Sequence, residues 1–208
     1  MTSPHACAAS IEALCKLNRQ LLKQKLGLMD VLRSRFGLAE AAALYKTQCP
    51  IVHASVGQHI RHSMDHIQLA VEAARDYGVD GVDPVHYDLR RRGGDDEHDI
   101  DAAEARIEGV LAAIDDVAAR GSADPTIPQE TLLTPQSRLD VQFMLSSDPD
   151  EFGMTTSIGR ELGFVAHHAI HHLALVRIIS VNTLGLASED LPAGFGRAPS
   201  TQEFDNRR

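Results

Sequence analysis

The chain has 208 residues, of which 43% are hydrophobic and 24% are charged, and this composition is that of an ordinary globular domain. Its 29 acidic residues outnumber its 20 basic residues, so the formal charge of -9 removes the electrostatic basis for binding nucleic acid or an anionic membrane surface. We therefore expect residues 1–208 to form a single domain that has no nucleic-acid partner.

The sequence also bears on the cellular compartment. No segment approaches the roughly 20 uninterrupted apolar residues that cross a bilayer, and the start MTSPHACAAS lacks the basic and apolar segments of a secretory signal. Cys7, Cys15 and Cys49 show no CxxC spacing, which argues against a disulfide framework or a thiolate metal site. These features predict a cytoplasmic protein with reduced cysteines and no membrane partner.

The first predicted helix begins after Ser10, whose hydroxyl is a suitable N-cap. Apolar side chains then recur mostly every three or four residues, as on one face of a helix, at Ile11, Leu14, Leu17, Leu21, Leu22, Leu28 and Leu32. A shorter helical run follows at residues 38–46 and stops before Pro50. Ser55 opens the second long helix, which we expect to end near Tyr77 because Gly78 follows.

The next segment, residues 79–99, is rich in Gly, Pro, Asp and Arg and has no apolar periodicity. A loop of about 20 residues is longer than compact domains usually contain without a functional reason. The third long helix is predicted at residues 100–120, where apolar residues share one face and Gly121 provides the stop.

Residues 125–153 combine four prolines with a short alternating stretch around Leu139, Val141 and Phe143. This stretch predicts either an irregular connection or a small hairpin. Ser157 caps the last long helix, which extends to about Gly185, and residues 191–208 are expected to form an extended tail.

Four long helices joined by long crossovers predict an all-α fold, a four-helix bundle with a small hairpin before the last helix. The scarcity of aromatic residues, 4% with no Trp, agrees with helices that pack through small side chains. Bundle cores are places where facing helices build metal sites from inward-pointing side chains, so the histidines matter most.

Four histidines lie within the apolar sequence FVAHHAIHHLALVRII of the last helix. His168 and His172 are four residues apart and project side by side, and His167 and His171 form the same pair rotated by about 100°. Only one pair can face the interior squarely. We favour His168 and His172, because their arc of the helix also carries Phe164, Leu175 and Ile179.

The second long helix carries His59, His62 and His66 within one sector, and their spacing alone does not choose among them. Two histidines from one helix and a third from another would offer three neutral imidazoles to a divalent ion and leave a position for water or substrate. Such an ion keeps its full charge and can acidify a bound water or thiol. Nitrogen ligands favour Zn, Ni or Fe over Mg or Ca.

Two segments resemble the DinB/YfiT-like superfamily of four-helix-bundle metalloproteins. SVGQHIRH, which starts at Ser55, matches the opening of the superfamily's second helix, and HAIHH matches its late histidine motif. The resemblance implies His62, His168 and His172 as the metal ligands. His62 lies nearly opposite the apolar stripe of its own helix, so this assignment requires that helix to be buried on both sides.

Several members of this superfamily are thiol-dependent transferases or isomerases. The resemblance therefore implies a metal-dependent enzyme that uses a low-molecular-weight thiol, with the metal-bound thiolate as nucleophile. It also implies a homodimer, as family members often associate in this way. The alternative is a non-catalytic metal-binding or stress-response protein in which the ion staples the bundle.

Two further sets of residues are predicted to support the metal site. Arg90, Arg91 and Arg92 could bind the carboxylates of an acidic substrate or a tripeptide-like thiol, the alternative being a solvated charged loop. Asp65 could orient a ligand imidazole or act as a base, or be a surface acid.

The remaining histidines receive weaker assignments. In a closed site, His66 or Asp65 is the expected fourth ligand. His59, His167 and His171 are expected to be neighbours of the site or surface residues.

Overall fold

The computed structural model describes residues 10–79, 83–89, 93–121, 132–148 and 150–207. Most of these residues are helical, which confirms the prediction of a mainly α fold. The helices are α1 (Ile11–Phe36), α2 (Leu38–Tyr45), α3 (Val56–Arg75), the short 3-10 helix η1 (Asp95–Glu97), α4 (Ile100–Arg120), α5 (Ile158–Asn182) and α6 (Pro199–Asn206). The strands are β1 (Val85–His86), β2 (Arg138–Met144) and β3 (Glu151–Ser157).

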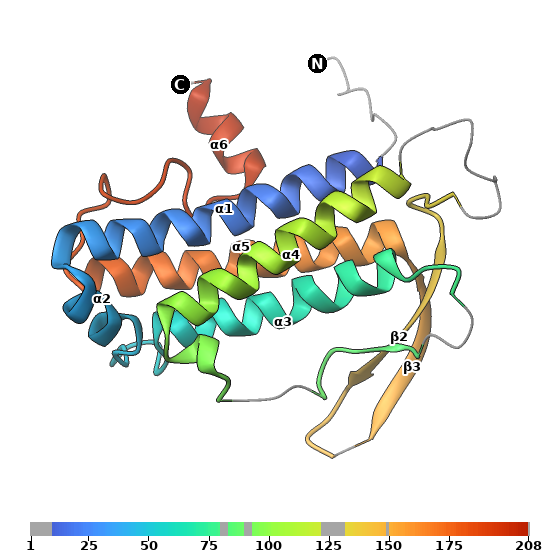
Figure 1. Cartoon of the computed structure of the whole chain (residues 1–208), viewed down its shortest axis with the longest axis horizontal. Coiled ribbons are helices and arrows are strands. Elements are labelled where there is room, and N and C mark those ends of the chain that lie inside the picture. The colour runs from blue at the N-terminus through green and yellow to red at the C-terminus, as the bar shows by residue number, and fades with distance from the viewer. Residues whose placement is uncertain (1–9, 80–82, 90–92, 122–131, 149, 208) are drawn as a thin grey trace.

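Four long helices, α1, α3, α4 and α5, lie side by side, and the small sheet extends from one end of them (Figure 1). α3 packs against α4 and α5, and α1 packs against the same two helices, so α1 and α3 are diagonal neighbours. The core lies between these helices and consists mainly of aliphatic side chains. Fourteen of the 20 residues of α3 are buried, so this helix is largely covered, as the assignment of half-buried His62 as a ligand requires.

The predicted helix starts are confirmed by their caps. Ser10 Oγ accepts a hydrogen bond from Ala13 N at 3.1 Å, and Ser157 Oγ accepts one from Arg160 N at 3.3 Å. Ser55 forms a reciprocal capping box with Gln58, which fixes the first turn of α3. Each cap supplies a partner for a backbone N–H that the first helical turn cannot satisfy internally.

The structure adds a small three-stranded sheet to the predicted helices. β2 and β3 form an antiparallel hairpin directly before α5, one of the two structures that residues 125–153 predicted. β1 adds a third strand, parallel to β2, with Val85 opposite Val141. A strand of two residues whose partner lies far along the chain leaves no local pattern, so β1 was not predicted.

The C-terminal segment also differs from the extended tail that was expected. Pro199 begins α6, as proline commonly does in the first turn of a helix. Before α6 the chain packs closely on α1 and α5: Gly196 N donates to Gln24 Oε1 at 3.1 Å. A Cβ at Gly196, where φ is 66°, would lie only 2.6 Å from Leu173 O, so this approach requires glycine.

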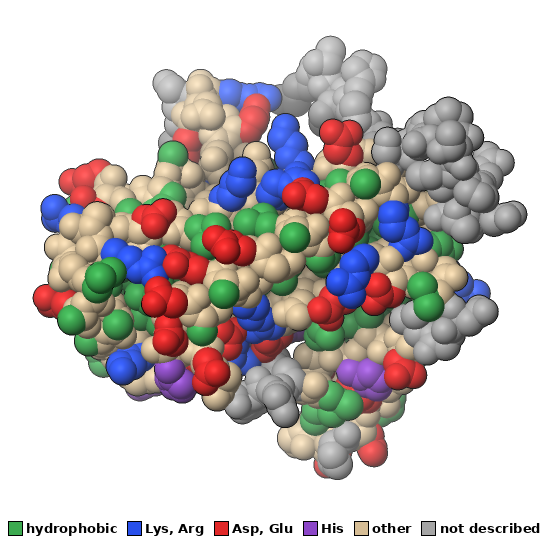
Figure 2. All heavy atoms as spheres, in the orientation of Figure 1, with side chains coloured by type: hydrophobic (Ala, Val, Ile, Leu, Met, Phe, Trp, Pro, Cys, Tyr) green, Lys and Arg blue, Asp and Glu red, His purple; other side chains and the backbone are tan. Residues whose placement is uncertain are grey.

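Acidic and basic side chains are interspersed over the face that α1 and α4 present in Figure 2. Ion pairs join these two helices, including Arg19 with Asp115 at 2.6 Å and Arg33 with Glu104. Such partly exposed pairs contribute little stability individually, so burial of the apolar core remains the main source of stability.

Among the described helices, α5 alone is long and apolar enough to cross a membrane. It is also a central helix of this fold, with buried side chains along its whole length. A core helix of a protein in water passes the same test of length and composition.

The side chain of Lys25 extends from α1 to α3, the helix diagonally opposite. Its side chain is fully buried, and Nζ donates to Ser63 Oγ at 2.8 Å. Ser63 Oγ in turn donates to the backbone oxygen of His59, so this contact supports the turn of α3 that carries the histidines. Burial, with a smaller contribution from Arg106, lowers the pKa of Lys25 from its ordinary 10.5 to about 7.

We expect the stability of the protein to rise with pH above 7 because of Lys25. Between pH 7 and 10.5 the unfolded chain keeps the Lys25 proton and the folded chain does not, so raising the pH favours folding. Lys25→Met should remove this part of the slope and, at pH 7, raise the free energy of unfolding by on the order of 1 kcal/mol. Urea unfolding of both proteins at pH 7.0 and 8.5 tests this. If the free energy of unfolding changed equally with pH in the two proteins, the predicted contribution of Lys25 would be contradicted.

Candidate metal centre

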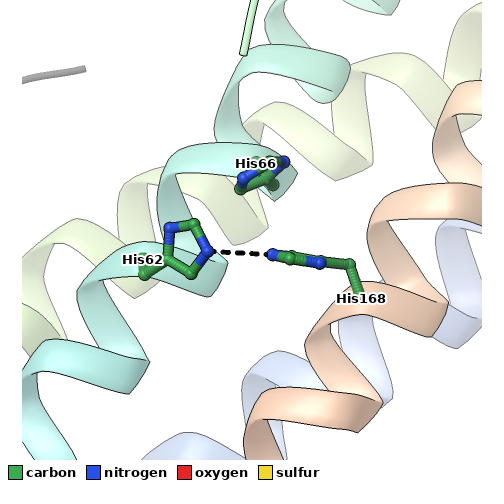
Figure 3. A group of neighbouring side chains, drawn as sticks. All are labelled: His62, His66 and His168. Atoms are coloured by element: carbon green, nitrogen blue, oxygen red, sulfur yellow. Dashed lines mark hydrogen bonds between the residues drawn. The ribbon is translucent and has the colours of Figure 1, made fainter. Parts of the chain in front are cut away.

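Three histidines meet where α3 faces α5. His62 and His66 are one turn apart on α3, and His168 reaches them from α5 (Figure 3). Each can offer one ring nitrogen such that all three nitrogens lie within 4.8 Å of one another. His62 Nε2 and His168 Nε2 are 3.1 Å apart and share a hydrogen bond. These three side chains could hold a metal ion.

The spacing suits a small divalent ion. Zinc binds histidine nitrogens at about 2.0–2.1 Å, so two nitrogens on one tetrahedral ion are about 3.3 Å apart. The distance of 3.1 Å between Nε2 of His62 and Nε2 of His168 is close to this value. No two of the three ligand nitrogens are more than 4.8 Å apart. Three imidazoles without a carboxylate form a donor set suited to Zn, Ni or Fe.

His172, predicted as a ligand, lies beside this group. Its ring centre is 4.5 Å from those of both His62 and His168. Its Nδ1 lies 2.9 Å from Nδ1 of His59, with which it shares a hydrogen bond. The ligand role of His172 stays a prediction, whereas His66 occupies the third place in the group of three.

The imidazoles of His59 and His172 are neutral at ordinary pH. Burial lowers the pKa of His59 below its usual 6.5, with a smaller contribution from His171. Burial also lowers the pKa of His172, to about 2, and repulsion from His168 and His62 adds to this effect. A neutral imidazole keeps the lone pair that a metal requires.

Aromatic rings surround one side of the group. Tyr87, directly after β1, stacks on His66 with ring centres 5.1 Å apart, and Phe143 of β2 stacks on Tyr87 at 5.2 Å. Phe164 of α5 stacks on His168 at 5.9 Å. These rings restrict how the imidazoles can turn and lower the polarity of their surroundings. The small sheet therefore contributes directly to the site.

Glu161 anchors this aromatic wall. It is fully buried, and one carboxylate oxygen accepts from Tyr87 Oη at 2.9 Å. The other oxygen accepts from Thr156 Oγ1 and from Arg160 Nη1, both at 2.8 Å. A buried carboxylate with three donors is well satisfied, so Glu161 holds Tyr87 against His66.

Asp65 belongs to a buried ion-pair network between α3 and α4. Its oxygens accept from Arg61 Nη1 at 2.6 Å and from Arg106 Nη2 at 2.9 Å. Arg61 also pairs with Glu97, and Arg106 with Asp96. A cavity of about 410 Å³ opens over this network. The geometry gives Asp65 a structural role, and its predicted role as a base stays untested.

The other predicted residues fall into two groups. Arg90, Arg91 and Arg92 lie outside the described residues. His167 and His171 are exposed on α5, as expected for residues that are not ligands.

Sequence reasoning missed the rings around the histidines. Tyr87 comes from a segment predicted as a loop, and Phe143 from one predicted as either an irregular connection or a small hairpin. No local pattern links either residue to α3. His66 did carry a signal, since four residues separate it from His62 and it therefore shares the same face of the helix.

Comparison with known proteins assigns no family to this chain. No family model matches it, and no solved structure does. FK506-binding protein 5 of Rhizopus delemar is 33% identical over 120 residues, which are 58% of this chain and 27% of that protein. The chain thus spans about a quarter of the length of this relative.

Proposed function

We propose that this chain is a divalent-metal-dependent protein of the DinB/YfiT-like type, in which the four long helices form a bundle and His62, His66 and His168 hold the ion. The observation that carries this proposal is the convergence of three ring nitrogens within 4.8 Å, from two helices that are far apart in sequence. The histidine motifs of α3 and α5, which match that superfamily in helix order, independently support His62 and His168 as ligands, whereas His66 is included on the geometry alone.

The activity that we propose is transfer or isomerisation with a low-molecular-weight thiol. An ion bound by neutral imidazoles keeps its full positive charge and favours the thiolate form of a thiol that it binds. The residues of the chain would orient the ion and limit the access of water, with His66 and His168 held by Tyr87 and Phe164. The proposed substrate is a small molecule. We further propose that the protein acts in the cytoplasm and as a homodimer.

A second candidate is a non-catalytic protein that uses the ion to fasten α3 to α5. The position of His172, with its ring centre 4.5 Å from those of two members of the group, favours this candidate. A further imidazole would complete the coordination of a tetrahedral ion and leave no position for a thiol.

Elemental analysis of protein purified without an affinity tag, followed by thiol titration of the cobalt-substituted form, tests both candidates. We expect about one divalent ion per chain and a change in the cobalt absorption spectrum when a thiol is added. The matching S-methylated compound, which cannot form a thiolate, is the control. Binding of the ion without any response to thiols would favour the non-catalytic candidate, and absence of metal after reconstitution would exclude both.

A further inference from the structure

A cavity of about 450 Å³ lies between α5 and the segment that follows it, where the chain turns back along the bundle toward α6 (Figure 1). Small-molecule sites usually have about 300–1,000 Å³. The turns of this segment depend on Gly194 and Gly196, whose φ angles are 70° and 66°. Leu191 and Phe195, both buried, contribute apolar surface to the lining. The segment thus forms a defined wall of the cavity.

Arg177 of α5 also lines this cavity. Of the arginines that the structure describes, it alone forms no hydrogen bond or ion pair, although its side chain is half-buried. A guanidinium group that gives up part of its hydration without gaining an acceptor is in an unfavourable state. An anion in the cavity would relieve this, so Arg177 points to an anionic ligand.

The other charged groups of the lining limit the charge of that ligand. Arg197 is already paired with Asp205, and Glu189, which is exposed, adds one negative charge. An anion with one charge would be repelled by Glu189 less than a phosphate group, whose charge at pH 7 is about -1.5 to -2. A carboxylate also matches the planar guanidinium fork with two parallel hydrogen bonds.

We propose that this cavity binds a small monocarboxylic acid, with its carboxylate on Arg177 and its apolar part against Leu191 and Phe195. The site is separate from the metal centre. Arg177 is nine residues beyond His168, roughly 13 Å along α5, and no histidine lines the cavity. The proposal therefore does not depend on the ion.

Titration calorimetry at pH 7 with hexanoate and benzoate tests this site, with hexanamide and benzamide as uncharged equivalents. We expect the acids to bind and the amides to bind at least about 10-fold more weakly, since both lack the charge that Arg177 recognises. Arg177→Gln should weaken binding of the acids by a similar factor. Glu189→Gln should tighten it, by up to about fivefold, because an exposed like charge is removed.

Arg138→Gln serves as the control, because Arg138 is an exposed arginine of β2 that does not line the cavity. It should bind the acids as the wild type does. Backbone amide NMR of the wild type locates the ligand, and we expect the largest shifts at Gly194, Gly196 and their neighbours.

Three results would overturn the proposal. The first is equal affinity of the acids for the wild type and Arg177→Gln. The second is binding of the amides as tightly as the acids, or of inorganic phosphate more tightly than either acid. The third is a wild type that binds neither acid at millimolar concentrations. Should Arg177→Gln not fold, the comparison of acids with amides and the affinity of Glu189→Gln still decide.

Discussion

Replacing His168 with alanine is expected to weaken the binding of Zn²⁺ or Co²⁺ by more than about 100-fold. Losing only a residue that hydrogen-bonds to a ligand costs up to about 100-fold, and losing the ligand itself should cost more. His168 is the member of the group of three that α5 supplies, and its Nε2 lies 3.1 Å from Nε2 of His62. Without it, the two remaining members come from one helix and the link between α3 and α5 is lost. Metal content and titration with Co²⁺ measure this loss.

His167→Ala is the matched control, because His167 precedes His168 on the same helix but its side chain is exposed. It should retain one ion per chain with unchanged affinity. Equal losses in the two variants would mean that the effect comes from the helix as a whole and not from coordination by His168.

The second large effect is expected from Asp65→Ala. This change removes the carboxylate that Arg61 and Arg106 share and leaves two partly buried guanidinium groups with less compensation. Breaking a buried pair by removing one partner typically costs about 3–5 kcal/mol of the free energy of unfolding. Urea unfolding of the metal-free protein measures this cost. The folded variant should still bind metal, because Asp65 is not a member of the histidine group.

Asp76→Ala provides the comparison for this change. Asp76 also pairs with an arginine, Arg75, but both side chains are more than 40% exposed. Removal of such a pair should cost less than about 1 kcal/mol. If the two variants unfold at the same urea concentration, the network around Asp65 does not have the structural role inferred for it. If Asp65→Ala lost its metal while its stability was unchanged, Asp65 would have a functional role in the metal site.

The helices could be predicted because their signals are local. Ser10, Ser55 and Ser157 each precede a run of apolar residues with helical spacing, and each caps the helix that follows. The histidine spacing was equally informative, since residues four apart share one face of a helix whatever the rest of the fold does.

The composition of the site depended on contacts that local patterns do not contain. Spacing left His59, His62 and His66 equivalent on their helix, and only the position of α5 distinguishes them. The aromatic wall and the ion pair between Asp65 and Arg106 likewise join segments that are far apart in the chain. α6 was missed because Pro199 and the preceding glycines favour a loop, although proline also suits the first turn of a helix.

The separation of His62 and His168 along the chain has a consequence for folding. The two residues are 106 positions apart, so an ion that they share would close a loop containing α4 and the whole sheet. Closing a loop of this length restricts the unfolded chain far more than a contact within one helix does. The ion would thus act as a removable cross-link, and α4 and the hairpin would gain from it although neither contributes a ligand.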